Sequence, residues 1–224
     1  MQVSAVLLAA GASERMGYNK MLLPLCGKTP VEHCLDMLLR CQTQFCKIVI
    51  AVCEQTEPLA LSLCERHPEL AGVLSVVRGG AVRGESVLRA LQEAQADVVV
   101  IQDCARCLTK PETIDQSVRS AQQHGSGVAG VYSRDTVRTT DGEVLERTKL
   151  FVTQTPQTFL YGRILRAYED AQRQDISATD DCALYERLGY KAAFVEADII
   201  NQKLTFAEDV PFFEAVLASR HTEA

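Results

Sequence analysis

Apolar, β-branched runs recur along the chain and alternate with stretches whose apolar residues follow a helical spacing. These runs predict strands at residues 3–9, 48–52, 73–77, 98–101 and 128–131. Residues 29–32 (Thr-Pro-Val-Glu) predict a helix start with a capping box and a proline at the first helical position, and residues 109–112 (Thr-Lys-Pro-Glu) repeat the signal. Strands that alternate with helices indicate right-handed βαβ units, and therefore an α/β fold with a doubly wound, mostly parallel sheet.

One segment interrupts this alternation. Asp141 and Gly142 lie between two short β-prone stretches, 137–140 and 143–148, which is a strong signal for a β-hairpin. Both stretches are rich in charge and threonine, and an isolated two-stranded hairpin is marginal in water, so it needs a surface to lie on. A symmetric partner subunit and the hairpin's own subunit both meet this need, and the spacing alone does not choose between them.

Composition limits the classes of protein to which the chain can belong. Its 224 residues, 47% of them hydrophobic, suit one domain with a large buried core. The formal charge of -6 argues against a nucleic-acid binder, so an anionic ligand must be met by local clusters of Lys and Arg. We expect a cytoplasmic protein that does not enter a membrane, because no apolar run is long enough to cross a bilayer and the N-terminal segment lacks a basic leader.

The nine cysteines are odd in number and suggest no disulfide framework. Most of them fall in apolar-periodic segments: Cys34, Cys41, Cys46, Cys53 and Cys64. We therefore expect reduced thiols that pack in the core. Cys104 and Cys107 form the only CxxC pair, and one such pair without a second is weak evidence for a zinc or redox centre.

The first residues suited to chemistry follow the first expected strand, in LLAAGASERMGYNK (residues 7–20). Gly11 and its small neighbours let the backbone approach a phosphate, while Arg15 offers a planar fork and Lys20 a compact charge. Ligands of doubly wound folds bind at this end of the strands. This loop contains neither the GxGxxG nor the Walker pattern, so a solvated loop with stray charges remains the alternative.

Asp103 ends another apolar strand, and Arg106 follows three residues later. A carboxylate at this position either caps the next turn or holds a divalent cation, since Mg²⁺ commonly takes one or two carboxylates together with substrate phosphates. Arg147 follows the hairpin, residues 155–157 (Thr-Pro-Gln) have no obvious secondary structure, and Lys203 follows a late strand. Singly, each is more often a surface residue, but a doubly wound sheet can bring them together.

Segments spread over nearly the whole chain occur in the order found in one enzyme family: LAAGASERMGYNK, GGAVRGESVLRAL, QDCAR, RDTVR, RTKLFVTQTPQTF, TDDCALYERLGY and NQKLT. On these motifs the sequence resembles the nucleotidyltransferases of the sugar-nucleotide pyrophosphorylase type. More narrowly, it is similar to the cytidylyltransferases that act on 2-C-methyl-D-erythritol 4-phosphate or ribitol 5-phosphate. The resemblance implies a single nucleotidyltransferase domain over residues 1–224, with a Rossmann-like nucleotide-diphospho-sugar transferase fold and a protruding β-hairpin arm at about 134–152.

The resemblance also implies a reaction. The cytidylyl group of CTP would pass to 2-C-methyl-D-erythritol 4-phosphate, giving 4-diphosphocytidyl-2-C-methyl-D-erythritol and pyrophosphate, in the methylerythritol phosphate pathway of isoprenoid precursor biosynthesis. Ribitol 5-phosphate as the acceptor, or a nucleotide-binding homologue with little activity, are the alternatives. Mg²⁺ or another divalent cation would be the cofactor, CTP and a small polyol phosphate the ligands, and a homodimer joined through the arm the assembly.

By position, the resemblance assigns Arg15 and Lys20 to charge neutralisation, and Arg147 and Lys203 to orientation of the incoming phosphate. It places the metal at Asp103. The nucleotide-binding positions are Ala9, Ala10, Gly11, Ala12, Gly80 and Ser86. The substrate-side positions are Arg106, Thr136 and Thr155. In such a dimer, Arg147 and Thr136 would serve the neighbouring subunit's site.

Two departures from the family pattern put the acceptor's identity in question. Residues 102–107 read Gln-Asp-Cys-Ala-Arg-Cys where HDAARP is common, and Ala81 stands where an acidic residue often follows the glycine pair. Neither departure removes one of the four assigned cations.

Overall fold

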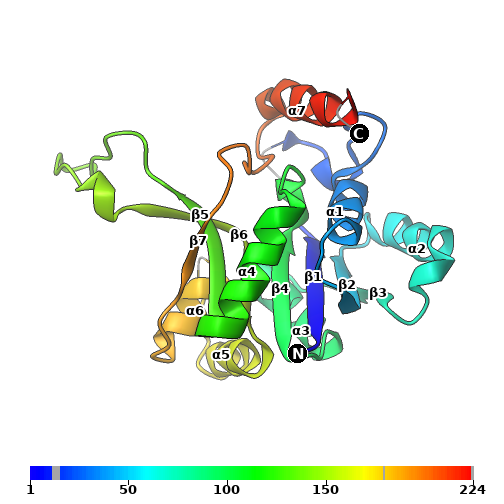
Figure 1. Ribbon diagram of the computed structural model, residues 1–224, viewed down its shortest axis with the longest axis horizontal. Helices are drawn as coiled ribbons and strands as arrows, with labels where there is room; N and C mark the ends of the chain where they lie inside the picture. The colour runs from blue at the N-terminus through cyan, green and yellow to red at the C-terminus, as the bar shows by residue number, and fades with distance from the viewer. Residues whose placement is uncertain (12–15, 179, 223–224) are drawn as a thin grey trace.

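The computed structural model describes residues 1–11, 16–178 and 180–222 of the chain. A seven-stranded sheet in the order β3-β2-β1-β4-β6-β5-β7 forms its centre (Figure 1). The strands are β1 (Val3–Ala9), β2 (Phe45–Val52), β3 (Leu74–Arg78), β4 (Val98–Asp103), β5 (Ser126–Tyr132), β6 (Phe151–Leu160) and β7 (Phe194–Glu196). Only β6 of these seven runs antiparallel to its neighbours, so the prediction of a mostly parallel α/β sheet is confirmed.

Helices cover both faces of the sheet (Figure 1). They are α1 (Pro30–Leu39), α2 (Glu57–Arg66), α3 (Arg83–Glu93), α4 (Pro111–His124), α5 (Tyr161–Arg173), α6 (Asp181–Arg187) and α7 (Val210–Thr222). One apolar cluster joins α1, α2, α4 and α7 to the sheet, and a second joins α3, α5 and α6 to it. Neighbouring strand residues belong to different clusters, as Ala5 and Val6 do. The central strands are continuous apolar runs because both of their faces are buried.

The two helix-start signals in the sequence have different outcomes. At α1 the capping box is confirmed: the Thr29 hydroxyl accepts a hydrogen bond from the Glu32 amide at 3.4 Å, and the Glu32 carboxylate accepts one from the Thr29 amide at 2.8 Å. At α4 the predicted box is wrong, because Lys110 is the N-cap and makes no side-chain cap. The Thr109 hydroxyl instead lies 2.7 Å from the side-chain oxygen of Asn201, so a tertiary contact replaces the local one.

Strand β6 contains residues 155–157, to which the sequence interpretation assigned no element. Its composition is polar, yet residues 154–159 are buried between β4 and β5. Pro156, whose peptide bond with Thr155 is cis, has no N–H to donate to a ladder. The register of β5 against β6 shifts between Val128 and Gly130, beside this proline. A proline inside the strand and a polar sequence together explain why periodicity missed it.

Residues 133–150, between β5 and β6, extend away from the body of the molecule as the arm (Figure 1). The Thr139 amide donates to the Glu143 carbonyl at 2.9 Å, and Gly142 adopts a φ of 101° in the turn. The predicted hairpin is therefore present. However, its two stretches pair through one isolated bridge, between Arg138 and Val144, rather than as regular strands.

Every one of the nine cysteines lies in the described part of the chain, and each is a free thiol. Of the five expected in the core, Cys34 is buried, Cys46 is exposed and the other three are half-buried, so that expectation is wrong for Cys46. Within the described ranges, no three His, Cys, Asp or Glu side chains are grouped to hold a metal ion. None of the described helices has the length and apolar character to span a membrane.

Candidate active site

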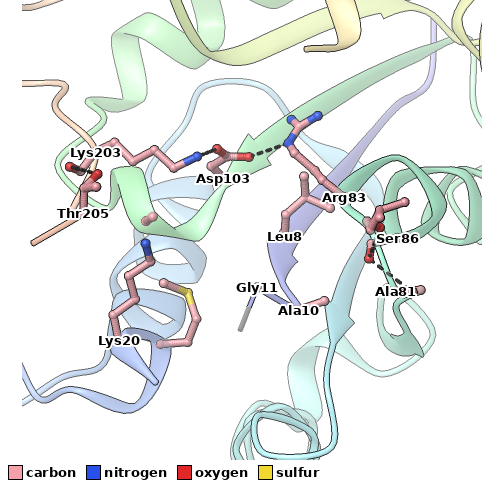
Figure 2. A pocket seen from close by; sticks show the side chains of 14 residues that line it. Leu8, Ala10, Gly11, Lys20, Ala81, Arg83, Ser86, Asp103, Lys203 and Thr205 are labelled. Atoms are coloured by element: carbon pink, nitrogen blue, oxygen red, sulfur yellow. Dashed lines mark hydrogen bonds and ion pairs between the residues drawn. The ribbon is translucent and has the colours of Figure 1, made fainter. Parts of the chain in front are cut away.

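A cavity of about 520 Å³ opens at the carboxyl ends of β1 and β4 (Figure 2). Its lining residues are Leu8, Ala10, Gly11, Lys20, Met21, Gly80, Ala81, Val82, Arg83, Ser86, Asp103, Ala105, Lys203 and Thr205. Among these lining residues Asp103 is the one carboxylate, while Lys20, Arg83 and Lys203 supply cations. This edge of a doubly wound sheet is where ligands bind, and the charge balance of the lining favours an anion.

Two loops of small residues build one wall of this cavity. A Cβ atom on Gly79 would lie 2.6 Å from both the Ala10 Cβ and the Ser86 Oγ, so glycine lets the loop after β3 approach the loop after β1. The Ser86 hydroxyl accepts a hydrogen bond from the Gly80 amide at 3.0 Å and lies 3.2 Å from the Val82 carbonyl oxygen. The wall is therefore held by hydrogen bonds between the Ser86 hydroxyl and the backbone, and it presents little side-chain bulk to a ligand.

Asp103 lies between two cations (Figure 2). Its Oδ1 accepts a hydrogen bond from Arg83 Nε at 3.2 Å, and its Oδ2 accepts one from Lys203 Nζ at 2.7 Å. Burial by itself raises the pKa of Asp103, but attraction to Arg83 and to Lys203 outweighs it and lowers the pKa to about 2. The carboxylate is therefore ionised at neutral pH, and both of its oxygens have cationic partners.

Arg83 is in turn held by Asp181. The Arg83 Nη1 and Nη2 atoms donate to the two oxygens of Asp181 at 2.7 and 2.8 Å, and the Asp181 side chain is 0% exposed. Burial alone lowers the pKa of Arg83, but the Asp181 carboxylate outweighs this effect and the pKa is raised. Tyr168, on α5, also donates to Asp181. A buried bidentate pair of this kind fixes the guanidinium plane.

A second cavity, of about 210 Å³, lies beside the first. Its lining residues are Arg83, Asp103, Arg106, Thr153, Gln154, Thr155, Gln157, Asp180 and Lys203. Arg83, Asp103 and Lys203 line both cavities, so the chain of ion pairs that they form lies at the boundary between the two.

Contacts between distant segments shape the second cavity. The Thr155 hydroxyl accepts a hydrogen bond from the Asp103 amide at 3.1 Å. Asn201 is 1% exposed, and its amide donates to Gln154 Oε1 at 2.9 Å and to the Thr155 carbonyl at 3.0 Å. Arg106 Nη1 donates to the Asn201 carbonyl at 2.9 Å. Asn201 therefore joins β6, the turn after β4 and the segment that carries Lys203.

The Gln102 side chain, at the first departure from the family pattern, is fully buried. Its amide nitrogen lies 2.9 Å from the Thr109 hydroxyl and 3.2 Å from the carbonyl oxygens of Asp103 and Arg106. Glutamine thus holds the turn (Cys104–Arg106) that follows β4.

The structure brings together most of the residues that the sequence singled out. Those that line the first cavity are Ala10, Gly11, Lys20, Gly80, Ser86, Asp103 and Lys203, and those that line the second are Arg106, Thr155, Asp103 and Lys203. Ala9 is fully buried and lines neither cavity; its carbonyl oxygen accepts a hydrogen bond from the Thr56 hydroxyl at 3.1 Å. Arg15 and Ala12 lie outside the described residues.

Two predicted residues lie on the arm, away from both cavities of their own chain. Thr136 and Arg147 are exposed, and Arg147 Nη1 donates to the Arg134 carbonyl oxygen at 3.2 Å. Neither residue belongs to the lining of the two cavities described above. A role in the chain's own site is therefore not supported by this placement.

Arg83 and Asp181 were missed by the sequence interpretation. Arg83 occurs in GGAVRGESVLRAL as one charge among several at a helix start. The clue for Asp181 was the pair of adjacent acids in TDDCALYERLGY: a helix needs one N-cap, and Asp180 supplies it by accepting from the Ala183 amide at 2.9 Å. Asp181, the first helical residue, is a second acid that is not the N-cap, so it requires another partner.

Comparisons with known proteins agree with this geometry. The family model described as 2-C-methyl-D-erythritol 4-phosphate cytidylyltransferase matches residues 3–219. A protein of that name from Shouchella clausii is 34% identical over 230 residues, covering 100% of both chains, and one from Syntrophotalea carbinolica is 35% identical, covering 97% of both.

Solved structures give the same result. The 4-diphosphocytidyl-2C-methyl-D-erythritol synthase of Anaerococcus prevotii superposes with a TM-score of 0.84 at 25% identity, covering 97% of this chain and 96% of the other. The 2-C-methyl-D-erythritol 4-phosphate cytidylyltransferase of Thermus thermophilus has a TM-score of 0.81 at 26% identity, covering 97% and 100%. With its fold, its cavity and its full-length relatives in agreement, the chain belongs to the 2-C-methyl-D-erythritol 4-phosphate cytidylyltransferase family, a family of nucleotidyltransferases.

Proposed function

We propose that the chain transfers the cytidylyl group of CTP to 2-C-methyl-D-erythritol 4-phosphate, with release of pyrophosphate. The observation that carries the proposal is the ion-pair chain of Arg83, Asp103 and Lys203 between two adjoining cavities, one for each reacting anion. Full-length relatives named for this activity support the choice of substrates.

In this reaction an oxygen of the acceptor phosphate bonds to the α-phosphorus of CTP. The bond from that phosphorus to the oxygen bridging to the β-phosphate breaks, and pyrophosphate leaves with the bridging oxygen. The two reactants are mutually repelling anions, so catalysis consists mainly of positioning and charge stabilisation. No covalent enzyme intermediate is required.

The first cavity suits the nucleotide. The loops around Ala10, Gly11, Gly80 and Ser86 offer backbone groups and space for the cytidine, as their small side chains allow. Lys20 lines the same cavity and would neutralise the triphosphate together with Arg15. Ala9 and Ala12 complete the assigned set, Ala9 through the packing beneath this loop.

The second cavity suits the acceptor. Lys203 borders both cavities and would hold the attacking phosphate near the α-phosphorus, while Arg106 and Thr155 line the acceptor side. Arg147 and Thr136 would complete this site from the arm of the neighbouring subunit. Preorganised cations of this kind are the main source of rate acceleration in reactions that develop charge.

The residues present fit a hard divalent cation such as Mg²⁺. Asp103 is an ionised carboxylate that lines both cavities, and a single carboxylate suffices for a cation that also binds substrate phosphates. When bound, the cation would draw charge from the triphosphate. In the protein alone both oxygens of Asp103 have cationic partners. For Asp103 to hold the cation, Lys203 would therefore have to release the carboxylate.

Exposed aromatic residues at the base of the arm support the proposal of a homodimer. Tyr132 and Phe194 are more than half exposed, and both rings pack on Phe151, with centroid distances of 5.3 Å for Tyr132 and 4.6 Å for Phe194. Exposed apolar groups of this size in one place mark interaction surfaces. A second copy of the chain would cover them and exchange arms. Free cysteines and two phosphorylated substrates accord with a cytoplasmic location.

Pyrophosphate release tests the proposal directly. The purified chain is assayed with Mg²⁺, each of the four common nucleoside triphosphates, and either 2-C-methyl-D-erythritol 4-phosphate or ribitol 5-phosphate. We expect release with CTP and the methylerythritol acceptor. Faster turnover with ribitol 5-phosphate would reassign the acceptor, and no release with either acceptor, despite CTP binding, would indicate a nucleotide-binding homologue.

A further inference from the structure

Arg83 occupies a distinctive place between the two cavities. It is the first residue of α3, and its side chain lines both cavities, as those of Asp103 and Lys203 do. Figure 2 shows its guanidinium directed toward Asp103, on the side of the carboxylate opposite Lys203. The two reacting anions must meet across this row of three side chains.

We propose that Arg83, clamped by Asp181, is a positioning residue for the transfer reaction and fixes the Asp103 carboxylate at the boundary between the two cavities. The inference rests on the proposed function, because it concerns the same reaction. It assigns Arg83 no contact with substrate.

The clamp determines what Arg83 can do. Both terminal nitrogens of its guanidinium are engaged by Asp181 at 2.7 and 2.8 Å, so its fork is not available to a phosphate. The third nitrogen, Nε, donates to Asp103 at 3.2 Å. Asp181 itself is fully buried and receives a further hydrogen bond from Tyr168. Moving Arg83 would leave a buried carboxylate without its cation, which is strongly unfavourable.

Lys203 differs from Arg83 in each of these respects. Its side chain is 38% exposed, it forms an ion pair with Asp103, and its flexible stem allows the ammonium to turn. When a cation or phosphate enters the site, Asp103 Oδ2 can therefore lose Lys203 as its partner while Arg83 still donates to Oδ1. The carboxylate keeps its orientation while one of its two partners changes.

Two other roles for Arg83 make different predictions. If Arg83 bound the nucleotide directly, its loss would raise KM for CTP. If it only stabilised the fold, its loss would lower the melting temperature and the yield, but not kcat per folded site. A positioning role predicts a lower kcat with a nearly unchanged KM for CTP, because misplacement by about 1 Å can cost on the order of 10²-fold in rate.

The experiment compares Arg83→Lys, Asp181→Asn and the double variant in steady-state kinetics, with kcat per folded site taken from circular dichroism. We expect kcat to fall about 10- to 100-fold in each single variant, with KM for CTP changing less than about 3-fold. The Asp181 side chain lines neither cavity, and two of its hydrogen bonds come from Arg83. If it acts through Arg83, the double variant should be no slower than the slower single variant.

The Arg83→Met, Asp181→Leu variant distinguishes a positioning role from misfolding. It removes both buried charges together, and such replacements are often tolerated. This variant should fold and still show the lower kcat. Arg78→Gln is the matched control: Arg78 also makes a two-point pair, with Glu57 at 3.0 and 2.5 Å, but on the surface. We expect its kcat to equal that of the wild type.

Wild-type kcat in the folded Arg83→Met, Asp181→Leu variant would overturn the positioning role, as would a rise in KM for CTP without a fall in kcat. Additive losses in the Arg83→Lys, Asp181→Asn double variant would also overturn it. These results leave the proposed function intact, since the wild-type chain is active in all of them. A wild-type chain that releases no pyrophosphate would instead refute the proposed function and the inference with it.

Discussion

The cations of the cavity and those of the arm differ in how firmly the chain holds them. Arg83 and Lys203 share one carboxylate, Asp103, and Arg83 is further clamped by a fully buried acid. Arg147 lies on an exposed arm, where it donates a hydrogen bond of 3.2 Å to the Arg134 carbonyl. The first set is in place before any ligand binds, whereas the second has few contacts to fix it.

This difference shows which side chains of the molecule are preorganised. Side chains at the ends of central strands are fixed because helices on both faces of the sheet bury their bases. An arm with a single isolated bridge has no such support from its own chain. If the proposed dimer forms, its partner supplies the missing surface, so substitutions in the cavity and on the arm should have effects of different kinds.

The largest effect is expected from the cavity lysines. Lys20→Ala or Lys203→Ala should lower kcat on the order of 10²- to 10³-fold, because each removes a preorganised cation facing the reacting anions. Steady-state pyrophosphate release measures this effect, and the same loss is expected for Arg15→Ala. Lys110→Ala is the matched control, since its 2.5 Å pair with Asp198 lies outside both cavities. Near-normal turnover in Lys20→Ala and Lys203→Ala would refute their role.

The arm should show a smaller effect, on one substrate. Arg147→Ala should raise KM for the acceptor about 10- to 100-fold, the value of one or two hydrogen bonds to a charged group, with little change in KM for CTP. Arg138→Ala, whose exposed side chain donates to the Gly142 carbonyl at 3.3 Å on the same arm, is the control. Equal effects on both KM values would contradict a role confined to the acceptor.

Mixed dimers extend this test to the partner subunit. Lys20→Ala and Arg147→Ala chains, each weakly active alone, are refolded together in equal amounts. If arms are exchanged, half of the dimers are mixed and each of these has one intact site, so about a quarter of wild-type activity should return. No recovery, with mixed dimers present, would place Arg147 in its own subunit's site or in none.

A still smaller effect is expected from the wall of the first cavity. Gly79→Ala should destabilise the fold by about 1–3 kcal/mol and raise KM for CTP, because its Cβ would overlap Ala10 and Ser86 at 2.6 Å. Gly162→Ala, in the first turn of α5, has no atom within 4 Å of the new Cβ and should be harmless. Urea denaturation and CTP titration distinguish the two variants.

The smallest effect tests a region remote from both sets of cations. Thr29→Ala removes the capping hydroxyl of α1 and should lower the free energy of unfolding by about 1 kcal/mol. Neither kcat nor KM should change, because Thr29 lines neither cavity. A loss of activity at unchanged stability would contradict this prediction and would mean that the start of α1 affects the geometry of the site.

Local sequence signals predicted the parts of this protein in which neighbouring residues decide the structure. The β1 strand, the α1 capping box and the turn at Gly142 were all predicted correctly. Strand β6 was missed because its polar residues are satisfied by other strands and by distant side chains, as Gln157 is by Asp180 at 3.0 Å. The Thr109 cap failed for the same reason, since its hydroxyl contacts Asn201.

The candidate site divides in the same way. The sequence by itself determined the family resemblance and indicated the loop after β1, Asp103 and Lys203, because these residues fall in short motifs at the ends of strands. Only the tertiary structure decided that Arg83 links Asp103 to Asp181 and that Asn201 joins three segments. Those contacts connect residues up to 98 positions apart in the chain. Burial makes them strong, because a charge or amide removed from water must find its partner wherever the fold supplies one.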